Sequence, residues 1–223
     1  MVVLRVKGQV VKEQLSKMRS EKLLIVFVKN IKLGKVKTRL AKTIGDDGAF
    51  EVYKELVNIT EAETKRLTNV DVHIYFSDVI IDTKWSGFDK YVQNGADLGE
   101  RMQNAFQHGF NQGYKKIIGV GSDLPDLNAD IMNEGLEALN DSNTVFGPSE
   151  DGGYYLIGMD QMYACIFENK PWSTEQLLSL TIEELKNENI NVKLLAELND
   201  IDNIEDLKAS SVSNKFKHLY ELS

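Results

Sequence analysis

The sequence predicts a three-layer α/β/α fold with a mostly parallel β-sheet, and two observations carry this prediction. The segment Leu23–Val28 is short, continuously apolar and rich in β-branched residues, which is typical of a strand covered on both faces in the middle of a parallel sheet. Apolar residues at helical spacing then occupy residues 45–67, and the alternating segment Val70–Phe76 follows them. This order of strand, helix and strand indicates parallel β-α-β winding.

The next elements repeat that order. Asp97 fits an N-cap with Glu100 three residues later, and the helix that it begins has an apolar face made of Leu98, Met102, Ala105, Phe106 and Phe110. We expect a strand over residues 115–122, a helix over residues 128–140 and a strand over residues 143–149 to follow.

The last elements include one reversed strand. The segment Tyr154–Met159 follows the previous strand too closely for a helical crossover, so we expect it to pair antiparallel or to belong to a bent flap. Ser173, with Gln176 completing a capping box, predicts the start of the last long helix, and a strand over residues 190–195 follows it. The predicted sheet is therefore parallel except for one element.

The composition predicts one domain, residues 21–223, behind an N-terminal extension, residues 1–20, in which residues 11–18 fit either a short edge strand or a helix. The formal net charge of −8 argues against nucleic acid and against an anionic membrane as partners. A single cysteine cannot form an internal disulfide, and the first residues lack the apolar core of a cleavable signal, so we expect a cytoplasmic protein. A homo-oligomer is compatible with these features.

A basic loop follows the first predicted strand. It contains no acid, and its six cations are Lys29, Lys32, Lys35, Lys37, Arg39 and Lys42. Gly34 lets backbone N–H groups approach a phosphate, and the dipole of the following helix adds positive charge. Ligands of open α/β sheets bind beyond the carboxyl ends of the strands, so this loop predicts a phosphate site rather than only a solvated surface. It is not a Walker A motif, because it lacks the second glycine.

Asp123 stands at the exit of another predicted strand, where its carboxylate can reach the same crevice. A carboxylate beside phosphates needs a cation between them, and Mg²⁺ or Mn²⁺ fits this place, held by one or two carboxylates, phosphate oxygens and water. Pro125 keeps Leu124 extended, and Asp126 fits a structural role better than a ligand. The three histidines share no ligand spacing, which argues against a zinc site.

Two further acidic segments lie at expected strand ends. Glu150 and Asp151 precede a Gly-Gly pair, and an acid there can deprotonate an acceptor hydroxyl or join the metal shell. An ordinary hairpin turn accounts for the glycines alone. Asp200 and Asp202 precede a short helix, so that one of them can be its N-cap and the other can complete a metal site.

Six motifs resemble, in this order, a family of bacterial glycosyltransferase-like proteins known as DUF2064 or selenodomain-associated transferase 1. The motifs are "GKVKTRLA", "QNGADLGERM", "GSDLPDL", "GPSEDGGYYLIG", "PWST" and "LNDIDNIEDL". The resemblance covers residues 23–207 and implies a nucleotide-diphospho-sugar transferase (GT-A) fold. The chain is more distantly similar to the molybdenum-cofactor and phospholactate guanylyltransferases. It departs from the family pattern in lacking proline-x-proline before Gly34.

The resemblance also implies roles for motif residues. The residues expected to bind the nucleotide are Gly34, Lys37, Thr38, Arg39, Gln93 and Gly95. We expect Asp123, with Asp202 as a second ligand, to hold Mg²⁺ or Mn²⁺. The residues expected on the acceptor side are Gly152, Gly153, Tyr154 and Trp172. Asp151 or Glu150 is expected to take the proton of the acceptor.

Three functions are compatible with these motifs. The first is metal-dependent transfer of a sugar from a nucleotide-diphospho-sugar to a hydroxyl acceptor. The second is a nucleotidyltransferase, which joins a nucleoside triphosphate to a phosphorylated acceptor and releases pyrophosphate. The third is a nucleotide-binding module without activity, against which the acids beside the basic loop argue.

Overall fold

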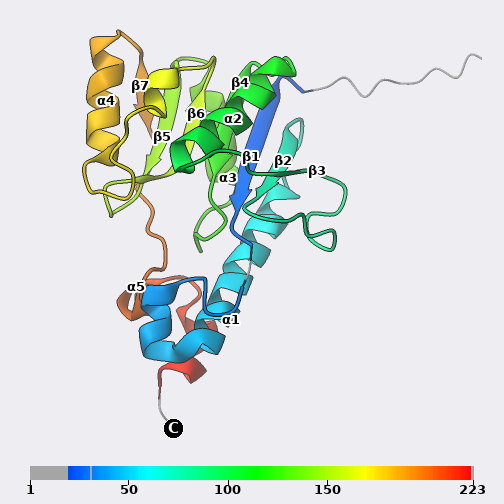
Figure 1. The fold of residues 1–223 in the computed structure, drawn as a ribbon, viewed down its shortest axis with the longest axis vertical. Coiled ribbons are helices and arrows are strands. Elements are labelled where there is room, and N and C mark those ends of the chain that lie inside the picture. Colours follow the sequence, from blue (N-terminus) through cyan, green and yellow to red (C-terminus); the bar gives the residue numbers. More distant parts are fainter. Residues whose placement is uncertain (1–19, 31, 222–223) are drawn as a thin grey trace, which may run out of the picture.

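A computed structural model describes residues 20–30 and 32–221, and a β-sheet runs through the middle of the molecule (Figure 1). In this part of the chain the sheet has seven strands in the order β3-β2-β1-β4-β6-β5-β7. The strands are β1 Lys22–Val28, β2 Asp71–Phe76, β3 Asp89–Val92, β4 Lys116–Val120, β5 Thr144–Pro148, β6 Tyr154–Met159 and β7 Val192–Leu194. The predicted extension lies, apart from Ser20, outside the described residues.

The sheet is parallel except for β6, which pairs antiparallel with β4 on one side and β5 on the other. The fold class predicted from the sequence is therefore confirmed, including its one reversed strand. The chain runs outward from β1 through β2 to β3 and then returns to β4 on the other side of β1. Such a reversal leaves a crevice at the carboxyl ends of β1 and β4, where ligands of open α/β sheets bind.

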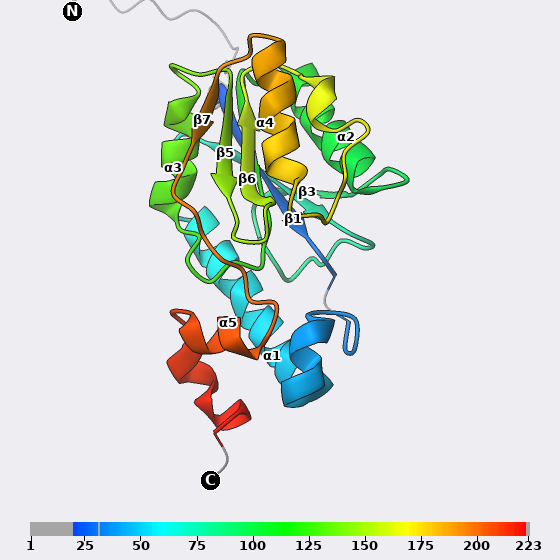
Figure 2. The same cartoon turned by 90° about the vertical axis from the view of Figure 1, so that its left-hand side faces the viewer.

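Helices cover both faces of the sheet (Figure 2). The helices are α1 Thr38–Thr64, α2 Leu98–Asn111, α3 Ala129–Ala138, α4 Leu177–Asn187 and α5 Ile204–Ala209, with 3₁₀ turns η1 Ala164–Ile166 and η2 Ser213–Leu219. Because strand side chains alternate, Leu24 and Val26 of β1 pack in the core under α1 and α3, whereas Leu23 and Ile25 pack in the core under α2 and α4. Each fully buried aliphatic side chain contributes about 1.5–3 kcal/mol to stability.

A third apolar cluster lies below the sheet, where α5 and η2 pack against the first half of α1 (Figure 2). Its fully buried members include Leu40, Leu56, Leu207 and Phe216. This cluster holds the chain segment before α5 against the start of α1. It therefore fixes residues 200–202 beside residues 37–39.

Several element boundaries differ from the sequence prediction. Helix α1 is divided at Gly45, whose φ of 78° and ψ of 165° are not helical, so the helix predicted from Gly45 is its second part, and the first part, from Thr38, was not predicted. Helix α4 begins at Leu177, and the predicted Ser173 cap is wrong, because Ser173 has φ 63° and no capping bond is formed. Strand β3 was not predicted, since none of its residues is buried and they show no apolar alternation.

Two helix starts are also informative. Asp97 caps α2 as predicted, with its Oδ1 accepting a bond of 2.9 Å from the Glu100 N–H. Leu98, predicted on the apolar face of this helix, is 48% exposed. Asn128 caps α3 by accepting bonds from the N–H groups of residues 130 and 131, so Asp126 is not the cap.

Candidate functional site

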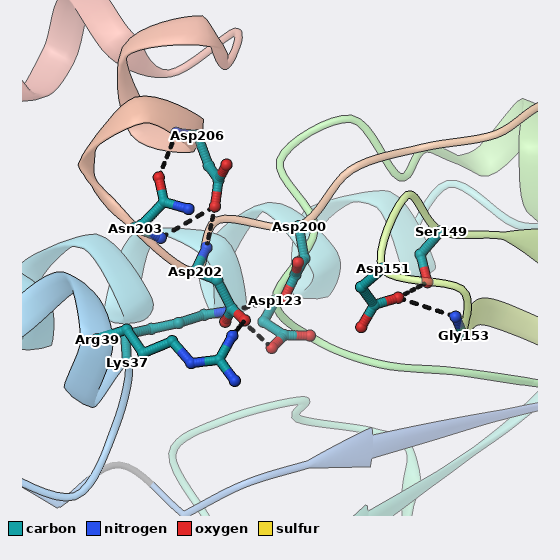
Figure 3. Close-up of polar contacts among 10 residues, drawn as sticks. All are labelled: Lys37, Arg39, Asp123, Ser149, Asp151, Gly153, Asp200, Asp202, Asn203 and Asp206. Carbon is teal, nitrogen blue, oxygen red and sulfur yellow. Dashed lines mark hydrogen bonds and ion pairs between the residues drawn. The ribbon is translucent and has the colours of Figure 1, made fainter. Parts of the chain in front are cut away.

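The centre of the site is the Lys37 side chain, which lies at the start of α1 and is only 5% exposed. Its Nζ lies 3.0 Å from Asp123 Oδ2, 3.2 Å from Asp200 Oδ2 and 3.8 Å from Asp202 Oδ1 (Figure 3). Burial opposes the charged form of Lys37, but these carboxylates outweigh burial and raise the pKa of Lys37. Lys37 is therefore a buried cation that stays charged and contacts three carboxylates.

The backbone of Lys37 is strained. Its φ of 45° and ψ of 49° lie in the left-handed region, which is uncommon for residues other than glycine. Gly34 has φ 72° and reaches the same region without a steric cost, which allows the loop to turn toward α1. Strain of this kind persists where surrounding contacts hold it, and the three carboxylates around the Lys37 ammonium are such contacts.

The start of the loop is fixed by Asn30, whose buried side chain binds the segment after β2. Its Oδ1 accepts bonds from the N–H groups of Asp78 and Val79, and its Nδ2 donates to the Val79 carbonyl at 2.7 Å. Lys32 also contacts the Asp78 carboxylate at 3.4 Å. The basic loop is thus tied to the loop beyond the neighbouring strand.

The acids come from two distant segments, β4 and the residues before α5. The N-cap of α5 is Asn203, which forms a capping box with Asp206, so neither Asp200 nor Asp202 caps the helix (Figure 3). Both acids face Lys37 instead, and Asp202 also accepts a 2.9 Å bond from Arg39 Nη1. Burial raises the pKa of Asp200, although the Lys37 ammonium opposes this shift.

A first cavity of about 320 Å³ opens at these residues. Its charged lining residues are Lys29, Lys37, Arg39, Asp123 and Asp202, and Thr38 lies beside them. The other three cations of the predicted basic loop, Lys32, Lys35 and Lys42, do not line this cavity.

Five uncharged residues that line the first cavity were not predicted from the sequence, namely Phe27, Val36, Tyr53, Gly121 and Ser122. The Tyr53 hydroxyl donates to the Lys29 carbonyl at 3.1 Å, and burial raises the pKa of Tyr53 to about 12, against the effect of a hydrogen bond with Ser122. Phe27 is the second-to-last residue of β1, and Ser122 directly precedes Asp123. For these two residues, position at a strand end was the available signal.

The turn between β5 and β6 presents Asp151. Asp151 Oδ1 accepts bonds from Ser149 Oγ at 2.6 Å and from the Gly153 N–H at 3.0 Å, which fixes the carboxylate (Figure 3). The neighbouring acid, Glu150, accepts a 3.0 Å bond from Asn199 and lines neither cavity described here. The structure therefore brings Asp151, but not Glu150, to the site.

A second cavity of about 300 Å³ adjoins the first. Asp123, Gly121 and Phe27 line both, while Asp151 and Asp200 line the second. Most of its remaining wall is apolar or aromatic, made of residues that include Leu98, Met102, Tyr154, Ile157, Trp172 and Leu177. Three residues expected on the acceptor side, Gly153, Tyr154 and Trp172, are thus lining residues. The fourth, Gly152, does not line the cavity and lies close against the Glu175 backbone.

A family model with the description "Uncharacterized protein conserved in bacteria (DUF2064)" matches residues 60–174, just over half of the chain. The chain belongs to the DUF2064 family. The match includes Asp123, Asp151 and Trp172, and it confirms the resemblance seen in the sequence motifs. The basic loop and the acids before α5 lie outside the matched residues.

Solved structures place the fold of this DUF2064 protein. A proposed nucleotide-diphospho-sugar transferase from Desulfovibrio desulfuricans G20 has a TM-score of 0.80 and 28% identity, covering 92% of this chain and 100% of that chain. A 4-diphosphocytidyl-2C-methyl-D-erythritol synthase from Anaerococcus prevotii DSM 20548 has a TM-score of 0.58 and 11% identity, covering 87% and 99%. An inositol-1-phosphate CTP transferase from T. maritima has a TM-score of 0.53 and 16% identity, covering 88% and 96%. The curated proteins contain no match.

Three residues expected to bind the nucleotide line neither cavity of the DUF2064 protein, namely Gly34 in the basic loop and, farther along the chain, Gln93 and Gly95. Gln93 Nε2 donates to the Tyr75 carbonyl at 3.0 Å, which extends the pairing of β2 and β3. A Cβ on Gly95 would lie 2.6 Å from the Arg101 backbone nitrogen, so Gly95 lets the chain pack against the start of α2. Within this structure both residues have a packing role, and their contact with a nucleotide stays a prediction.

The acids of the DUF2064 protein offer only part of the ligand set of a metal ion. Among residues 20–30 and 32–221, no three His, Cys, Asp or Glu side chains are placed to hold a metal ion by themselves. Mg²⁺ instead takes one or two carboxylates and completes its shell with phosphate oxygens and water. Asp123 and Asp202, which both line the first cavity, fit that smaller requirement, and their role as metal ligands stays a prediction.

The described part of the chain, residues 20–30 and 32–221, has no helix with the length and hydrophobicity of a membrane span.

Proposed function

We propose that this protein transfers a sugar from a nucleotide-diphospho-sugar to a hydroxyl acceptor, with Mg²⁺ or Mn²⁺ as cofactor. The observation that carries the proposal is Asp123, which lines a cation-bearing cavity on one side and an apolar cavity on the other. Transfer between two substrates needs two adjoining sites that meet at the reacting atoms. The likeness to the Desulfovibrio desulfuricans protein supports the donor class.

The first cavity suits the diphosphate of the donor. Arg39 is 76% exposed and offers its planar guanidinium to phosphate oxygens, while Lys37 supplies a second, buried charge. An incoming diphosphate competes with Asp202 for both cations. The carboxylates that it displaces from Lys37 are then free to hold the metal ion, which neutralises charge on the leaving diphosphate when bound.

The reaction requires one bond to form and one to break. The acceptor oxygen forms a bond to the anomeric carbon, and the bond between that carbon and the diphosphate oxygen breaks, with its electron pair leaving on the nucleoside diphosphate. Asp151, held by Ser149 and Gly153, accepts the proton of the acceptor hydroxyl. Lys37 and Arg39 stabilise the negative charge that accumulates on the leaving group.

Thermal stabilisation by nucleotides tests the donor assignment. Nucleotide sugars and nucleoside triphosphates are each added with and without Mg²⁺ or Mn²⁺, and a ligand at 100 times its Kd adds about 2.7 kcal/mol of stability. We expect metal-dependent stabilisation by a nucleotide sugar in the wild type and its loss in Asp123→Asn. Metal-independent binding, or binding by Asp123→Asn at wild-type strength, would contradict the role given to Asp123.

The released product separates this function from its alternatives. Glycosyl transfer releases a nucleoside diphosphate, whereas a nucleotidyltransferase acting on a phosphorylated acceptor releases pyrophosphate. Stabilisation by a triphosphate alone, with pyrophosphate release, would favour the nucleotidyltransferase. Stabilisation without turnover across a broad set of acceptors would favour a nucleotide-binding module. A cytoplasmic location and self-association stay predictions.

A further inference from the structure

The second cavity differs from the first in the charge of its walls. Among residues 20–30 and 32–221, none that lines it is Lys, Arg or His, and three, Asp123, Asp151 and Asp200, are acids. Asp123 and Asp200 both contact Lys37 Nζ, and Lys37 lines the first cavity. Asp151 accepts bonds from a hydroxyl and a backbone N–H group, and no Lys, Arg or His of the described part of the chain pairs with it.

These walls disfavour an anionic ligand. A phosphate or carboxylate in this cavity would face the Asp151 carboxylate, and like charges brought together in a partly desolvated site repel strongly. A phosphorylated acceptor needs Lys or Arg around its phosphate, as the first cavity provides and the second does not.

The apolar part of the cavity indicates what does bind. Trp172 and Tyr154 lie on its wall, and Leu98 at the start of α2 is an apolar side chain that is 48% exposed. The Tyr154 hydroxyl is buried and has no hydrogen-bond partner in residues 20–30 and 32–221. An exposed leucine and aromatic faces beside a cavity of this size suit a ring or a short apolar group.

From this cavity, and resting on the proposed function, we infer that the acceptor is a hydroxyl compound with an apolar or aromatic body and without phosphate or carboxylate. Its hydroxyl points toward Asp151 and the shared wall at Asp123, and its body lies against Trp172. In the transfer step, this hydroxyl oxygen bonds to the anomeric carbon of the donor, and its proton passes to Asp151.

Binding of a matched pair of probes tests this inference without turnover. Benzyl alcohol and 4-(hydroxymethyl)benzoate share a ring and a hydroxyl but differ in one carboxylate. Binding is followed by Trp172 fluorescence in the presence of the nucleoside diphosphate of the stabilising nucleotide sugar, which carries no sugar to transfer, and Trp172→Phe leaves only the signal of the fully buried Trp85. We expect benzyl alcohol to bind at least about tenfold more tightly than the benzoate.

The variant Thr174→Lys places a cation on the cavity wall. We expect it to narrow or reverse the preference between the two probes and to leave stabilisation by the nucleotide sugar unchanged. Equal binding of the two probes by the wild type, or no binding of benzyl alcohol while a nucleotide sugar still stabilises the protein, would overturn the inferred acceptor class alone. If no nucleotide sugar stabilises the protein, the proposed function falls, and the acceptor role falls with it.

Discussion

At the scale of single residues, the site depends on one cation serving three acids. Lys37 is nearly fully buried, while the side chains of Asp123, Asp200 and Asp202 are 37%, 30% and 39% exposed. The acids are therefore partly hydrated, whereas the charge of Lys37 has little water around it and is stabilised mainly by the acids. A buried charge without partners costs several kcal/mol, whereas exposed pairs contribute little.

Two variants measure how much these charged contacts stabilise the fold: Lys37→Met, and Arg39→Met as its exposed control. We expect Lys37→Met to lower the free energy of unfolding by about 1–3 kcal/mol, because it leaves three carboxylates close together. Arg39→Met, at an exposed position, should change it by less than about 1 kcal/mol. Both should weaken nucleotide-sugar binding about tenfold or more, since each removes a charged hydrogen bond to the phosphates. Urea unfolding and ligand titration measure the two effects, and wild-type stability of Lys37→Met would contradict the contacts of Figure 3.

Tyr53 predicts a pH dependence at the same site. Burial raises its pKa from 10.0 to about 12, so the folded state holds the proton more tightly than the unfolded state. The stability that this provides is fully present below pH 10 and is lost as the pH rises through about 12. Between pH 9 and about pH 11.5, we expect the free energy of unfolding of Tyr53→Phe to fall by about 1–2 kcal/mol less than that of the wild type. Denaturant unfolding at both pH values measures this, and equal losses would show that Tyr53 ionises normally.

At the scale of elements, the sequence predicted the buried strands well and the edges poorly. Leu23–Val28 and Tyr154–Met159 are almost fully buried, so their composition carries the signal of their position. Strand β3 lies at the sheet edge without a buried side chain, and only its pairing with β2 makes it a strand. The apolar periodicity starts at the break in α1 at Gly45, and the part of α1 before this break was not predicted, because it follows a left-handed Lys37, which no local pattern indicates.

The candidate site shows the same division. Asp123, Lys37 and Asp151 could be found from the sequence, because each follows a strand end or stands beside glycines. That one of Asp200 and Asp202 joins them was also predicted, but that both contact Lys37 could not be, since their position depends on how α5 packs against α1, more than 150 residues away in the chain. The capping role, open between Asp200 and Asp202, belongs to Asn203, because Asp206 completes the capping box only from that position.

The β5–β6 turn depends on a close backbone approach at Gly152. A Cβ there would lie 2.1 Å from the Glu175 carbonyl oxygen, and the residue has φ 81°. Gly87 has φ 88° and open space around it, which makes it a matched control. We expect Gly87→Ala to cost about 1–2 kcal/mol for backbone strain, and Gly152→Ala to cost about 1–3 kcal/mol more for the clash.

To relieve this clash, the turn and the segment at Glu175 must move apart, which should shift Asp151 and Trp172. Gly152→Ala should therefore also weaken acceptor binding, whereas Gly87→Ala should not. Unfolding midpoints and the Trp172 fluorescence titration measure the two effects. Equal stability losses in the two variants would mean that the turn does not approach residue 175 as described.

At the scale of the whole molecule, the first cavity is assembled from three parts of the chain. Its cations come from the segment between the end of β1 and the start of α1, Asp123 follows β4, and Asp202 precedes α5. The sheet fixes the first two, whereas Asp200 and Asp202 lie between Leu198, whose N–H donates to the Pro148 carbonyl of β5, and the apolar cluster in which α5 and η2 meet α1. Packing in that cluster is therefore coupled to donor binding, although no cluster side chain lines the cavity.

Two leucine variants separate this coupling from a general loss of stability. Leu207 lies in the α5 cluster and Leu185 lies near the end of α4, in the core under α2 and α4, and both are 0% exposed. Each change to Ala should cost about 2–5 kcal/mol through lost burial and the cavity left behind. At a temperature where both variants remain folded, we expect Leu207→Ala to weaken nucleotide-sugar binding severalfold and Leu185→Ala to bind as the wild type does. Calorimetric titration measures this difference, and equal affinities would show that residues 200–202 keep their place without the cluster.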